Sequence, residues 1–367
     1  MTPDRLAASD GDLPEAAFAA ALASLPGVGP ATLRRLLAAP EPPSAAWSRL
    51  TPDATAGIEV AQVWQRHQER EIGVHRRGRP GFPERLAGDP DAPAVLFTRG
   101  DLEVLNRYPT VALVGTRSPT RYGISVAAQF GADLAAAGVS VVSGLALGID
   151  GAAHEGACAA GAPPVAVVAG GLDDPYPRRH ARLFERVAQL GVVVSESPAG
   201  VRTEKWRFPV RNQLLAKLSD VVVVVESRHG GGSRHTVHAA LAGGTPVGAV
   251  PGSIRSRTSE GTNALLADGA FPVCDVGDIL MALSLTGARD PRPGEAGPPT
   301  APAVPRRPPP DYQGPDRALL DVLSAEPSSL DQLARAAGLD LPALCGGLER
   351  LATAGVARDI GGWWERV

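Results

Sequence analysis

The chain lacks the features that mark secreted, membrane-spanning or zinc-binding proteins. Its three cysteines, Cys158, Cys274 and Cys345, are far apart in the sequence, and they show neither the density of a disulfide framework nor the spacing of zinc ligands. No stretch approaches the ~18 uninterrupted apolar residues of a membrane helix. The N-terminal stretch MTPDRLAASDGD has no basic region followed by an apolar core, so no signal peptide is expected. We therefore expect a cytoplasmic protein with no membrane partner, no metal and no cofactor.

An excess of positive charge is also missing. The formal net charge is −3, and nearly all basic residues are arginines, with Lys205 and Lys217 as the only lysines. A protein that coats nucleic acid over its whole surface is usually basic overall. Any affinity for DNA must therefore come from a local patch.

The first 80 residues are expected to form a helical domain. Apolar periodicity and turn residues predict helices over Ala16–Ser24, Ala31–Ala39 and Pro52–Glu71. The segment LPGVGPATLRRLL, Leu25–Leu37, has the Gly-x-Gly turn of a helix-hairpin-helix, whose backbone N–H groups can bind a DNA phosphate. A tight corner in which the glycines only allow close helix packing explains the same residues.

Residues 81–286 are expected to form an α/β domain, because short apolar strands alternate with helical patterns. The strands are apolar throughout, which is typical of a sheet covered on both faces, so the fold class is a Rossmann-like, doubly wound and mostly parallel sheet. The expected strands are Ala94–Thr98, Thr110–Val114, Ser140–Val142, Val165–Ala169, Val192–Ser195, Val221–Val225 and Val247–Val250. The expected helices include Ile124–Ala137, Ile149–Ala160, Ala181–Leu190 and Thr236–Ala242.

The remaining residues are expected to form a linker and a second domain. Residues 287–312 are rich in proline and lack apolar periodicity, which is typical of a semi-rigid linker. In residues 313–367, three helices and a short hairpin around Gly361-Gly362 predict a winged helix, with Ser328 as the cap of its second helix. The expected helices are Arg317–Ser324, Ser329–Ala336 and Leu341–Ala354, and the expected hairpin strands are Val356–Asp359 and Trp363–Arg366.

The segment VALVGTRSPTRYG, Val111–Gly123, predicts an anion site between a strand and a helix. Gly115 allows close approach of the backbone, Thr116 offers a hydroxyl and an N–H, and Arg117 and Arg121 place two guanidinium groups near the helix start. Further glycines that follow strands, including Gly144 and Gly171, are expected at the same rim, because ligands of open α/β sheets lie beyond the carboxyl ends of the strands. An ordinary turn with a solvated arginine is the alternative.

Two further segments support a groove for a phosphate chain. The run Lys205–Asn212 interleaves Lys205 and Arg211 with Trp206 and Phe208, a combination that neutralises phosphates and stacks bases. The rings could instead anchor the core beneath a solvated basic loop. The turn GGGSRHT, Gly230–Thr236, opens a helix and can form a second phosphate site with Arg234 nearby.

The sequence offers little for catalysis. There is no G-x-S-x-G elbow and no G-x-x-x-x-G-K-[ST] run. Asp150, His154 and Asp173 could form an acid/base set. Asp150 and His154, four residues apart near a helix start, are more simply a helix cap and a structural partner.

The order of these motifs resembles that of the DNA-processing protein A family (DprA, also called Smf). VALVGTRSPTRYG, VVSGLALGIDGAAHEGA, AVVAGGLDDPYP, FPVRNQLLAKLSDVVVVVES, GGGSRHT and SEGTNALLADGA follow one another as in that family, over roughly residues 80 to 285. The resemblance implies a non-catalytic homodimer that binds single-stranded DNA and loads the RecA recombinase during natural transformation. It also implies roles for individual residues. Gly115, Thr116 and Arg117 would bind a phosphate, as would Gly232, Ser233 and Thr236. Lys205 and Arg211 would add basic contacts, and Asn212 would order the turn on which they sit.

The chain departs from the family pattern at two places. Gln213 stands where many relatives have an arginine, and Arg234 with His235 stand where many have two apolar residues. One basic contact is therefore absent from the first motif. The second departure either restores the charge or alters contacts with bases.

Two other classes of function compete with this interpretation. Phosphoribohydrolases of the lysine-decarboxylase-like class share this kind of sheet and carry P-G-G-x-G-T-x-x-E, but here Ala239 replaces the glutamate and His229 replaces the proline. Without that carboxylate, the group that would polarise the sugar or activate water is missing. A transcription factor is the third possibility, although the recognition-like helix has only Arg350 as a basic residue.

Overall fold

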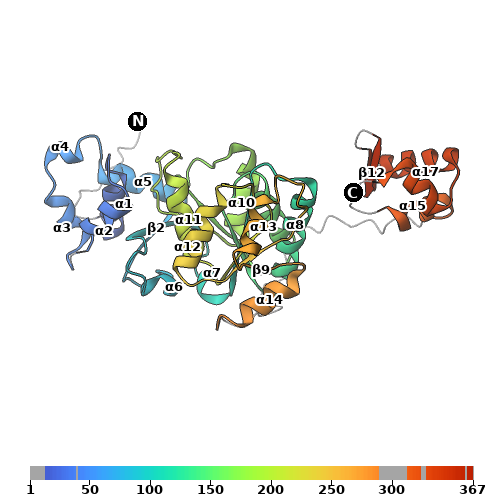
Figure 1. The fold of residues 1–367 in the computed structure, drawn as a ribbon. Helices are drawn as coiled ribbons and strands as arrows, with labels where there is room; N and C mark the ends of the chain where they lie inside the picture. The colour runs from blue at the N-terminus through green and yellow to red at the C-terminus, as the bar shows by residue number, and fades with distance from the viewer. Residues whose placement is uncertain (1–12, 39, 289–311, 324–327, 360–361, 367) are drawn as a thin grey trace, which may run out of the picture. The chain divides into compact units, whose positions relative to one another are not determined.

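The computed structural model describes residues 13–38, 40–288, 312–323, 328–359 and 362–366. The chain divides into two compact units, residues 1–300 and 301–367 (Figure 1). Most of the linker predicted for residues 287–312 lies outside the described residues. None of the helices in the described ranges is long and apolar enough to span a bilayer.

A nine-stranded sheet forms the centre of the first unit, in the order β1-β2-β6-β5-β4-β3-β7-β8-β9. The pairs from β6 to β9 are parallel, whereas β1 and β2 are added at one edge in antiparallel orientation. The predicted mostly parallel, doubly wound sheet is therefore confirmed. The strands are β1 Gly73–Arg76, β2 Val95–Gly100, β3 Thr110–Val114, β4 Ser140–Ser143, β5 Val165–Val168, β6 Val192–Ser195, β7 Val221–Val224, β8 Val247–Ala249 and β9 Phe271–Pro272.

The order of the strands reverses between β3 and β7. From β3 the chain moves outward through β4, β5 and β6, then crosses back to β7 and continues to β8 and β9 on the other side. Right-handed connections in opposite directions place the helices that follow β3 and β7 on opposite faces of the sheet. The carboxyl ends of β3 and β7 therefore form a topological switch point, the place where ligands of such sheets bind.

The helices of the α/β region form two packed groups. α8 packs against α9 and α9 against α10. α11 packs against α12 (Figure 1). The bounds are α6 Glu84–Ala87, α7 Val104–Arg107, α8 Arg121–Ala136, α9 Ile149–Cys158, α10 Ala181–Leu190, α11 Arg207–Lys217, α12 Ser233–Ala242, α13 Glu260–Ala267 and α14 Val276–Ser284, with a short 3-10 turn, η2, at Arg178–His180.

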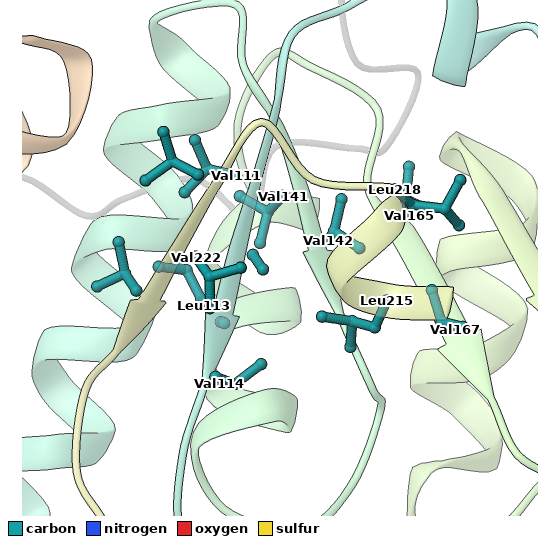
Figure 2. Packing of buried hydrophobic residues seen from close by; sticks show 14 of the residues in the cluster. Val111, Leu113, Val114, Val141, Val142, Val165, Val167, Leu215, Leu218 and Val222 are labelled. Atoms are coloured by element: carbon teal, nitrogen blue, oxygen red, sulfur yellow. The ribbon is translucent and has the colours of Figure 1, made fainter. Parts of the chain in front are cut away.

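The core of this unit is built from the central strands, whose residues are buried on both faces. Figure 2 shows branched side chains of neighbouring strands packed together, with Leu215 and Leu218 from the end of α11 beside them. Such continuous valine runs leave no polar face for solvent. The polar chemistry of the unit is therefore confined to the loops at the strand ends.

The N-terminal helices share a core with the antiparallel edge of the sheet. Leu22, Leu25 and Leu33 belong to the same buried cluster as Val95 and Phe97. His67 is fully buried; its Nδ1 lies 2.8 Å from Val63 O, and its Nε2 accepts a hydrogen bond from Ala199 N at 3.2 Å. The N-terminal helices are α1 Glu15–Ser24, α2 Pro30–Leu36, α3 Pro43–Ser48, α4 Pro52–Thr55 and α5 Val60–Glu69.

Two features of this region differ from the sequence-based expectation. The single helix predicted over Pro52–Glu71 is wrong, because the chain breaks at Gly57, whose φ of 79° a helix cannot contain, and forms α4 and α5 instead. Strand β1 and helix α3 are too short to leave a periodic pattern and were not predicted.

In its described residues, the second unit contains three helices and a three-stranded antiparallel sheet, the predicted winged-helix arrangement. Ser329 rather than Ser328 caps its second helix, with Gln332 completing a capping box, so the predicted cap was wrong by one residue. The turn residue Gly361 lies outside the described residues. The elements are α15 Pro315–Val322, β10 Ser328–Ser329, α16 Leu330–Ala337, α17 Leu341–Thr353, β11 Ala357–Asp359 and β12 Trp363–Arg366.

Helices α8 and α9 approach each other closely because glycines lie at their crossing. A Cβ atom on Gly131 would overlap the carbonyl oxygen of Ala153, and one on Gly156 would overlap the carbonyl oxygen of Ala128. Backbone atoms cannot yield as a flexible side chain can. The crossing therefore requires glycine at both positions.

We expect Gly131→Ala and Gly156→Ala each to lower the free energy of unfolding by about 1–3 kcal/mol, the usual cost of overpacking. Urea unfolding followed by circular dichroism measures this change. Gly88→Ala is the matched control, since Gly88 has a φ of −86° and no atom within 4 Å of an added Cβ. Equal stability of Gly131→Ala and the wild type would contradict the role of the crossing.

Candidate nucleic-acid interface

A groove of about 570 Å³ lies at the switch point. We call it the switch-point groove. It is bounded by the loop after β3, the start of α9, the first half of α11 and the loop from β7 into α12. Its polar and charged lining residues are Thr116, Arg117, Asp150, Lys205, Arg211, Asn212, Ser227, Arg228, Ser233, His235 and Thr236.

The Gly-Thr-Arg turn after β3 uses its own polar groups internally. Thr116 N donates to Glu226 O at 2.8 Å, and Thr116 Oγ1 accepts from Ser118 N at 3.2 Å. A Cβ on Gly115 would lie 2.6 Å from a side-chain carbon of Ile149, so this glycine allows the turn to pack on α9. Arg117 is exposed, and its Cζ lies 4.5 Å from the centroid of the Phe208 ring. Of the three residues, only Arg117 presents to the groove a charged side chain that makes no hydrogen bond or ion pair with the described residues.

The N-terminus of α8 is occupied by a carboxylate of the protein itself. Thr120 caps this helix by accepting from Gly123 N at 3.1 Å. Glu226, which is 3% exposed, accepts hydrogen bonds from Thr120 N at 2.8 Å and Thr120 Oγ1 at 2.6 Å. An anion placed there satisfies the helix dipole. Arg121 is exposed on the first turn of α8 and does not line the groove.

The N-terminus of α12 faces the groove without such a carboxylate. Its first turn contains no acidic residue. In the described part of the chain, no protein hydrogen bond engages the N–H groups of Gly232 and Ser233. The buried side chains of Ser233 and Thr236 line the groove, and Ser233 Oγ lies 2.8 Å from Ser227 Oγ. Open N–H groups at a helix start are a ready site for a phosphate.

The basic segment at 205–212 is mostly helical rather than a turn. α11 begins at Arg207 and therefore holds both Arg211 and Asn212, so the turn predicted for Asn212 is wrong. Pro209 lies in the first helical turn, where its missing N–H needs no partner. Asn212 Nδ2 donates to Gly232 O at 3.4 Å and so connects α11 to the loop before α12. Lys205, just before the helix, is exposed.

Arg211 lies in the floor of the groove. It is only 6% exposed, and its Nη1 donates to Gly144 O at 2.5 Å and to Val167 O at 2.7 Å. A Cβ on Gly144 would overlap this guanidinium group and would lie 2.6 Å from Asp150 Oδ2. Burial lowers the pKa of Arg211, whereas the charge of Asp150 raises it. Gly144 therefore serves to admit the Arg211 side chain.

Asp150 lines the groove from the start of α9, and His154 lies one turn further along the same helix. Burial raises the pKa of Asp150, and Arg211 and Arg117 act in the opposite direction. The N-cap of α9 is Gly148, so the predicted cap role of Asp150 is wrong. His154 is fully buried, and burial lowers its pKa to about 4. Within the described residues no group of three or more potential metal ligands is present.

A small cavity of about 60 Å³ adjoins the groove. Tyr176 and Phe208 form part of its wall, with their ring centroids 6.2 Å apart. Trp206 is 46% exposed, and Arg207 Cζ lies 4.2 Å from the centroid of its ring. Aromatic rings are thus available both inside and outside the groove.

The structure brings together most of the residues singled out from the sequence. The groove is lined by Gly115, Thr116, Arg117, Lys205, Arg211, Asn212, Gly232, Ser233 and Thr236. Arg121, Gly144, Gly171 and Arg234 lie outside its lining. Gly144 lines the adjoining small cavity instead, and Gly171 N donates to Val201 O at 2.8 Å. Sequence reasoning missed Arg228, Tyr176 and Glu226. Glu226 could have been found from the sequence, because an acidic residue that directly follows a fully apolar strand lies at the carboxyl end of that strand.

We expect His154 to make this unit less stable in acid. The folded state holds the imidazole neutral, whereas the unfolded chain binds a proton below about pH 6.5, so stability is lost as the pH falls. With a folded pKa of about 4, the loss between pH 8 and pH 5 is about 2 kcal/mol. In the His154→Leu variant this loss disappears, as measured by urea unfolding at both pH values. His229→Gln, at an exposed position, should keep the wild-type pH dependence, and an unchanged slope in His154→Leu would refute the assignment.

Comparisons with known proteins agree with this architecture. The family model described as DNA recombination-mediator protein A matches residues 74–284, and the model of the DprA winged helix domain matches residues 301–362. The DNA processing protein DprA of Bacillus subtilis is 34% identical over 225 residues, which is 61% of this chain and 76% of that protein.

Two solved structures extend the likeness. The X-ray structure of DNA processing protein A from Streptococcus pneumoniae has a TM-score of 0.61 and 27% identity, covering 73% of this chain and 98% of the other. The Helicobacter pylori protein, whose structure is described as giving insights into a single-stranded DNA binding mode, has a TM-score of 0.53 and 28% identity, covering 59% of this chain and 96% of the other. The chain belongs to the DNA recombination-mediator protein A family, also called DprA.

Proposed function

We propose that the switch-point groove binds the phosphate backbone of single-stranded DNA. The observation that carries the proposal is the charge of the lining. Arg117, Lys205 and Arg228 are exposed there, and Asp150, which is buried, is the single carboxylate among the described lining residues. The Helicobacter pylori relative, which binds single-stranded DNA according to the description of its structure, supports the same assignment here.

The residues of the groove divide into contacts and supports. The N–H groups of Gly232 and Ser233 receive one phosphate at the start of α12, with the hydroxyl of Thr236 beside them. Arg117 and Lys205 neutralise neighbouring phosphates. Arg211, Gly144 and Thr116 hold the floor and the β3 turn in place, because the protein already engages their polar groups. Gly115 lets the turn pack closely on Ile149 of α9. Arg121, Gly171 and Arg234 act outside the groove.

The groove binds bases with little sequence specificity. Phe208, Tyr176 and Trp206 offer rings for stacking, which every base can accept. Charge neutralisation supplies most of the affinity, so the binding constant falls steeply with salt. Weak sequence preference and strong salt dependence follow together.

The groove favours binding over hydrolysis. The position at which phosphoribohydrolases carry a glutamate is Ala239 on α12. The remaining carboxylate, Asp150, is buried beside Arg211. We therefore propose that the protein performs no catalytic step on nucleotides.

The winged helix is proposed to contact protein rather than read DNA. Arg350, the basic residue of α17, is engaged by Asp316 of α15 through bonds of 2.9 Å from Nε and 2.6 Å from Nη2. The hydrogen bond and charge of Arg350 lower the pKa of Asp316. A recognition helix needs free basic side chains to approach the major groove.

The wider biological role follows from the family. We propose a cytoplasmic homodimer that protects incoming single strands and loads RecA on them during natural transformation. We also propose that the helical region of residues 1–80, the α/β region 81–286, the linker 287–312 and the winged helix 313–367 act as separate functional regions.

Arg117→Ala tests the binding site. We expect affinity for labelled oligo-dT to fall roughly tenfold or more, since a charge-assisted hydrogen bond is worth about 1.5–3 kcal/mol. The slope of log K against log salt should flatten by about 0.7, the value for one phosphate of a single strand. Fluorescence anisotropy at several salt concentrations measures both. Arg107→Ala is the control, because Arg107 is ion-paired with Asp101 outside the groove. An unchanged salt slope in Arg117→Ala would show that Arg117 does not contact a phosphate.

RecA loading has its own test. ATP hydrolysis by RecA on single strands pre-coated with single-strand binding protein should start earlier when this protein is added. The Arg117→Ala variant should leave the lag unchanged, because it cannot hold the strand. If wild-type protein binds DNA but has no effect on the lag, the loading role is wrong while the binding role stands.

A further inference from the structure

A strained residue lies in the loop after β4, beside the switch-point groove. Leu145 has a φ of 55°, and within the described residues Glu71 is the only other non-glycine residue with a positive φ. Bulky side chains disfavour this left-handed conformation. Leu145 is also fully buried, in the same apolar cluster as Val168 and Phe184. Such a conformation persists only where the surrounding contacts hold it in place.

The side chain of His180 supplies one of these contacts. Its Nδ1 lies 2.9 Å from Leu145 O, and because a carbonyl oxygen can only accept, Nδ1 donates. His180 is the last residue of η2 and directly precedes α10. The bond therefore joins the loop after β4 to the loop between β5 and α10. A Cβ on Gly151 of α9 would overlap the imidazole, so glycine at this position lets the ring pack against the helix.

The two loops that His180 joins form part of the wall of the small cavity that adjoins the groove. The loop after β4 contributes three residues to its lining, and the loop before α10 contributes Tyr176 and Pro177. The lining also includes Arg117 and Phe208. His180 itself lines neither the small cavity nor the switch-point groove. Its effect on a bound strand would therefore be indirect, through the loops that it joins.

The loop after β4 also supports the turn that carries Arg117. Ile149 N, at the end of this loop, donates to Thr116 O at 3.3 Å. A Cβ on Gly148 would overlap Thr116 O and would lie 2.9 Å from the carbonyl carbon of Arg117. The end of the loop is thus packed directly against the turn. A shift of the loop therefore moves the backbone of Arg117.

We propose that His180 is a positioning residue of the switch-point groove. By holding Leu145 in its strained conformation, His180 fixes the loop after β4 and, through that loop, the position of Arg117. The proposal rests on the proposed function, because the positioning serves the contact between Arg117 and a phosphate. Without the bond, Leu145 relaxes towards an ordinary conformation and the turn that carries Arg117 loses its support.

Three variants separate this role from a general effect on stability. His180→Leu keeps a side chain that can pack on α9 but has no donor for Leu145 O. His180→Asn restores a donor at the same place along the side chain, since Nδ2 of asparagine and Nδ1 of histidine are both bonded to Cγ. Gly151→Ala keeps His180 but pushes its ring away from α9, because the added Cβ takes the place of the ring.

Anisotropy with labelled oligo-dT at several salt concentrations measures the effect on the groove. At about pH 8 histidines are ordinarily neutral, so the loss of the ring removes no charge. We expect His180→Leu and Gly151→Ala to bind about three- to tenfold more weakly, the usual value of one hydrogen bond. Their salt slope should flatten by up to about 0.7, the value of one phosphate contact. His180→Asn should return both quantities towards those of the wild type.

Hydrogen exchange followed by mass spectrometry reports on the loop in the absence of DNA. Peptides that contain Ile149 should exchange faster in His180→Leu and Gly151→Ala, because the hydrogen bond from Ile149 N to Thr116 O then opens more often. His180→Asn should restore the slow exchange. Equal exchange in His180→Leu and the wild type would overturn the proposal, since the loop would then not depend on His180.

His75→Leu is the matched control. It also removes an imidazole bonded to another side chain, since His75 Nε2 lies 2.9 Å from Thr98 Oγ1, and His75 lines neither the groove nor the small cavity. It should lower stability in urea unfolding and keep the wild-type affinity and salt slope.

The DNA measurements have a contrary outcome of their own. Wild-type affinity and salt slope in His180→Leu would overturn the positioning role even if stability falls, as would a His180→Asn variant as weak as His180→Leu. Failure of the proposed function looks different. The wild type would then not bind oligo-dT, or Arg117→Ala would leave the salt slope unchanged, while the exchange difference at Ile149 would remain.

Discussion

The buried carboxylate of Glu226 is the interaction on which the site depends. It follows β7, yet it accepts both hydrogen-bond donors of Thr120 at the start of α8, and its backbone carbonyl accepts from Thr116 after β3. The two strands at the switch point are thus joined by one residue. Because α8 already has its anion, a phosphate has no place there. The open helix start is that of α12, and this asymmetry leaves one helix start free for an anion where the sequence suggested two.

A second constraint comes from Arg211. A guanidinium group so deeply buried is costly unless it is hydrogen-bonded and paired, and here two carbonyls and Asp150 surround it. Its charge still contributes to the potential of the groove, since it lines the floor. Removing one partner of such a buried group leaves the other uncompensated. The same residue therefore links stability and the electrostatics of the site.

The sequence predicted the architecture well because the signals were strong and local. Runs such as Val221–Val224 are apolar on both faces, and the strand ends were placed within one or two residues. The errors fell at places where a single residue determines where a helix begins or ends, as at Gly57 in the N-terminal region and at Ser329 in the winged helix. At the site, sequence spacing brought the right segments together. It could not reveal that the N–H of Thr116 is already used by Glu226, since that bond joins residues 110 positions apart.

The net charge of −3 is compatible with DNA binding because the charges are segregated. Ion pairs such as Lys217–Asp89 and Arg34–Asp91 cancel on the outer side of α11 and α12. Arg117, Lys205 and Arg228 line the switch-point groove, where the buried Asp150 is the single carboxylate among the described lining residues. A field confined in this way acts within about a Debye length, ~8 Å at physiological salt. A strand is therefore attracted at the groove and repelled or ignored elsewhere, which orients it. A protein with little net charge and one basic groove therefore attracts a strand along that groove rather than at many places on its surface.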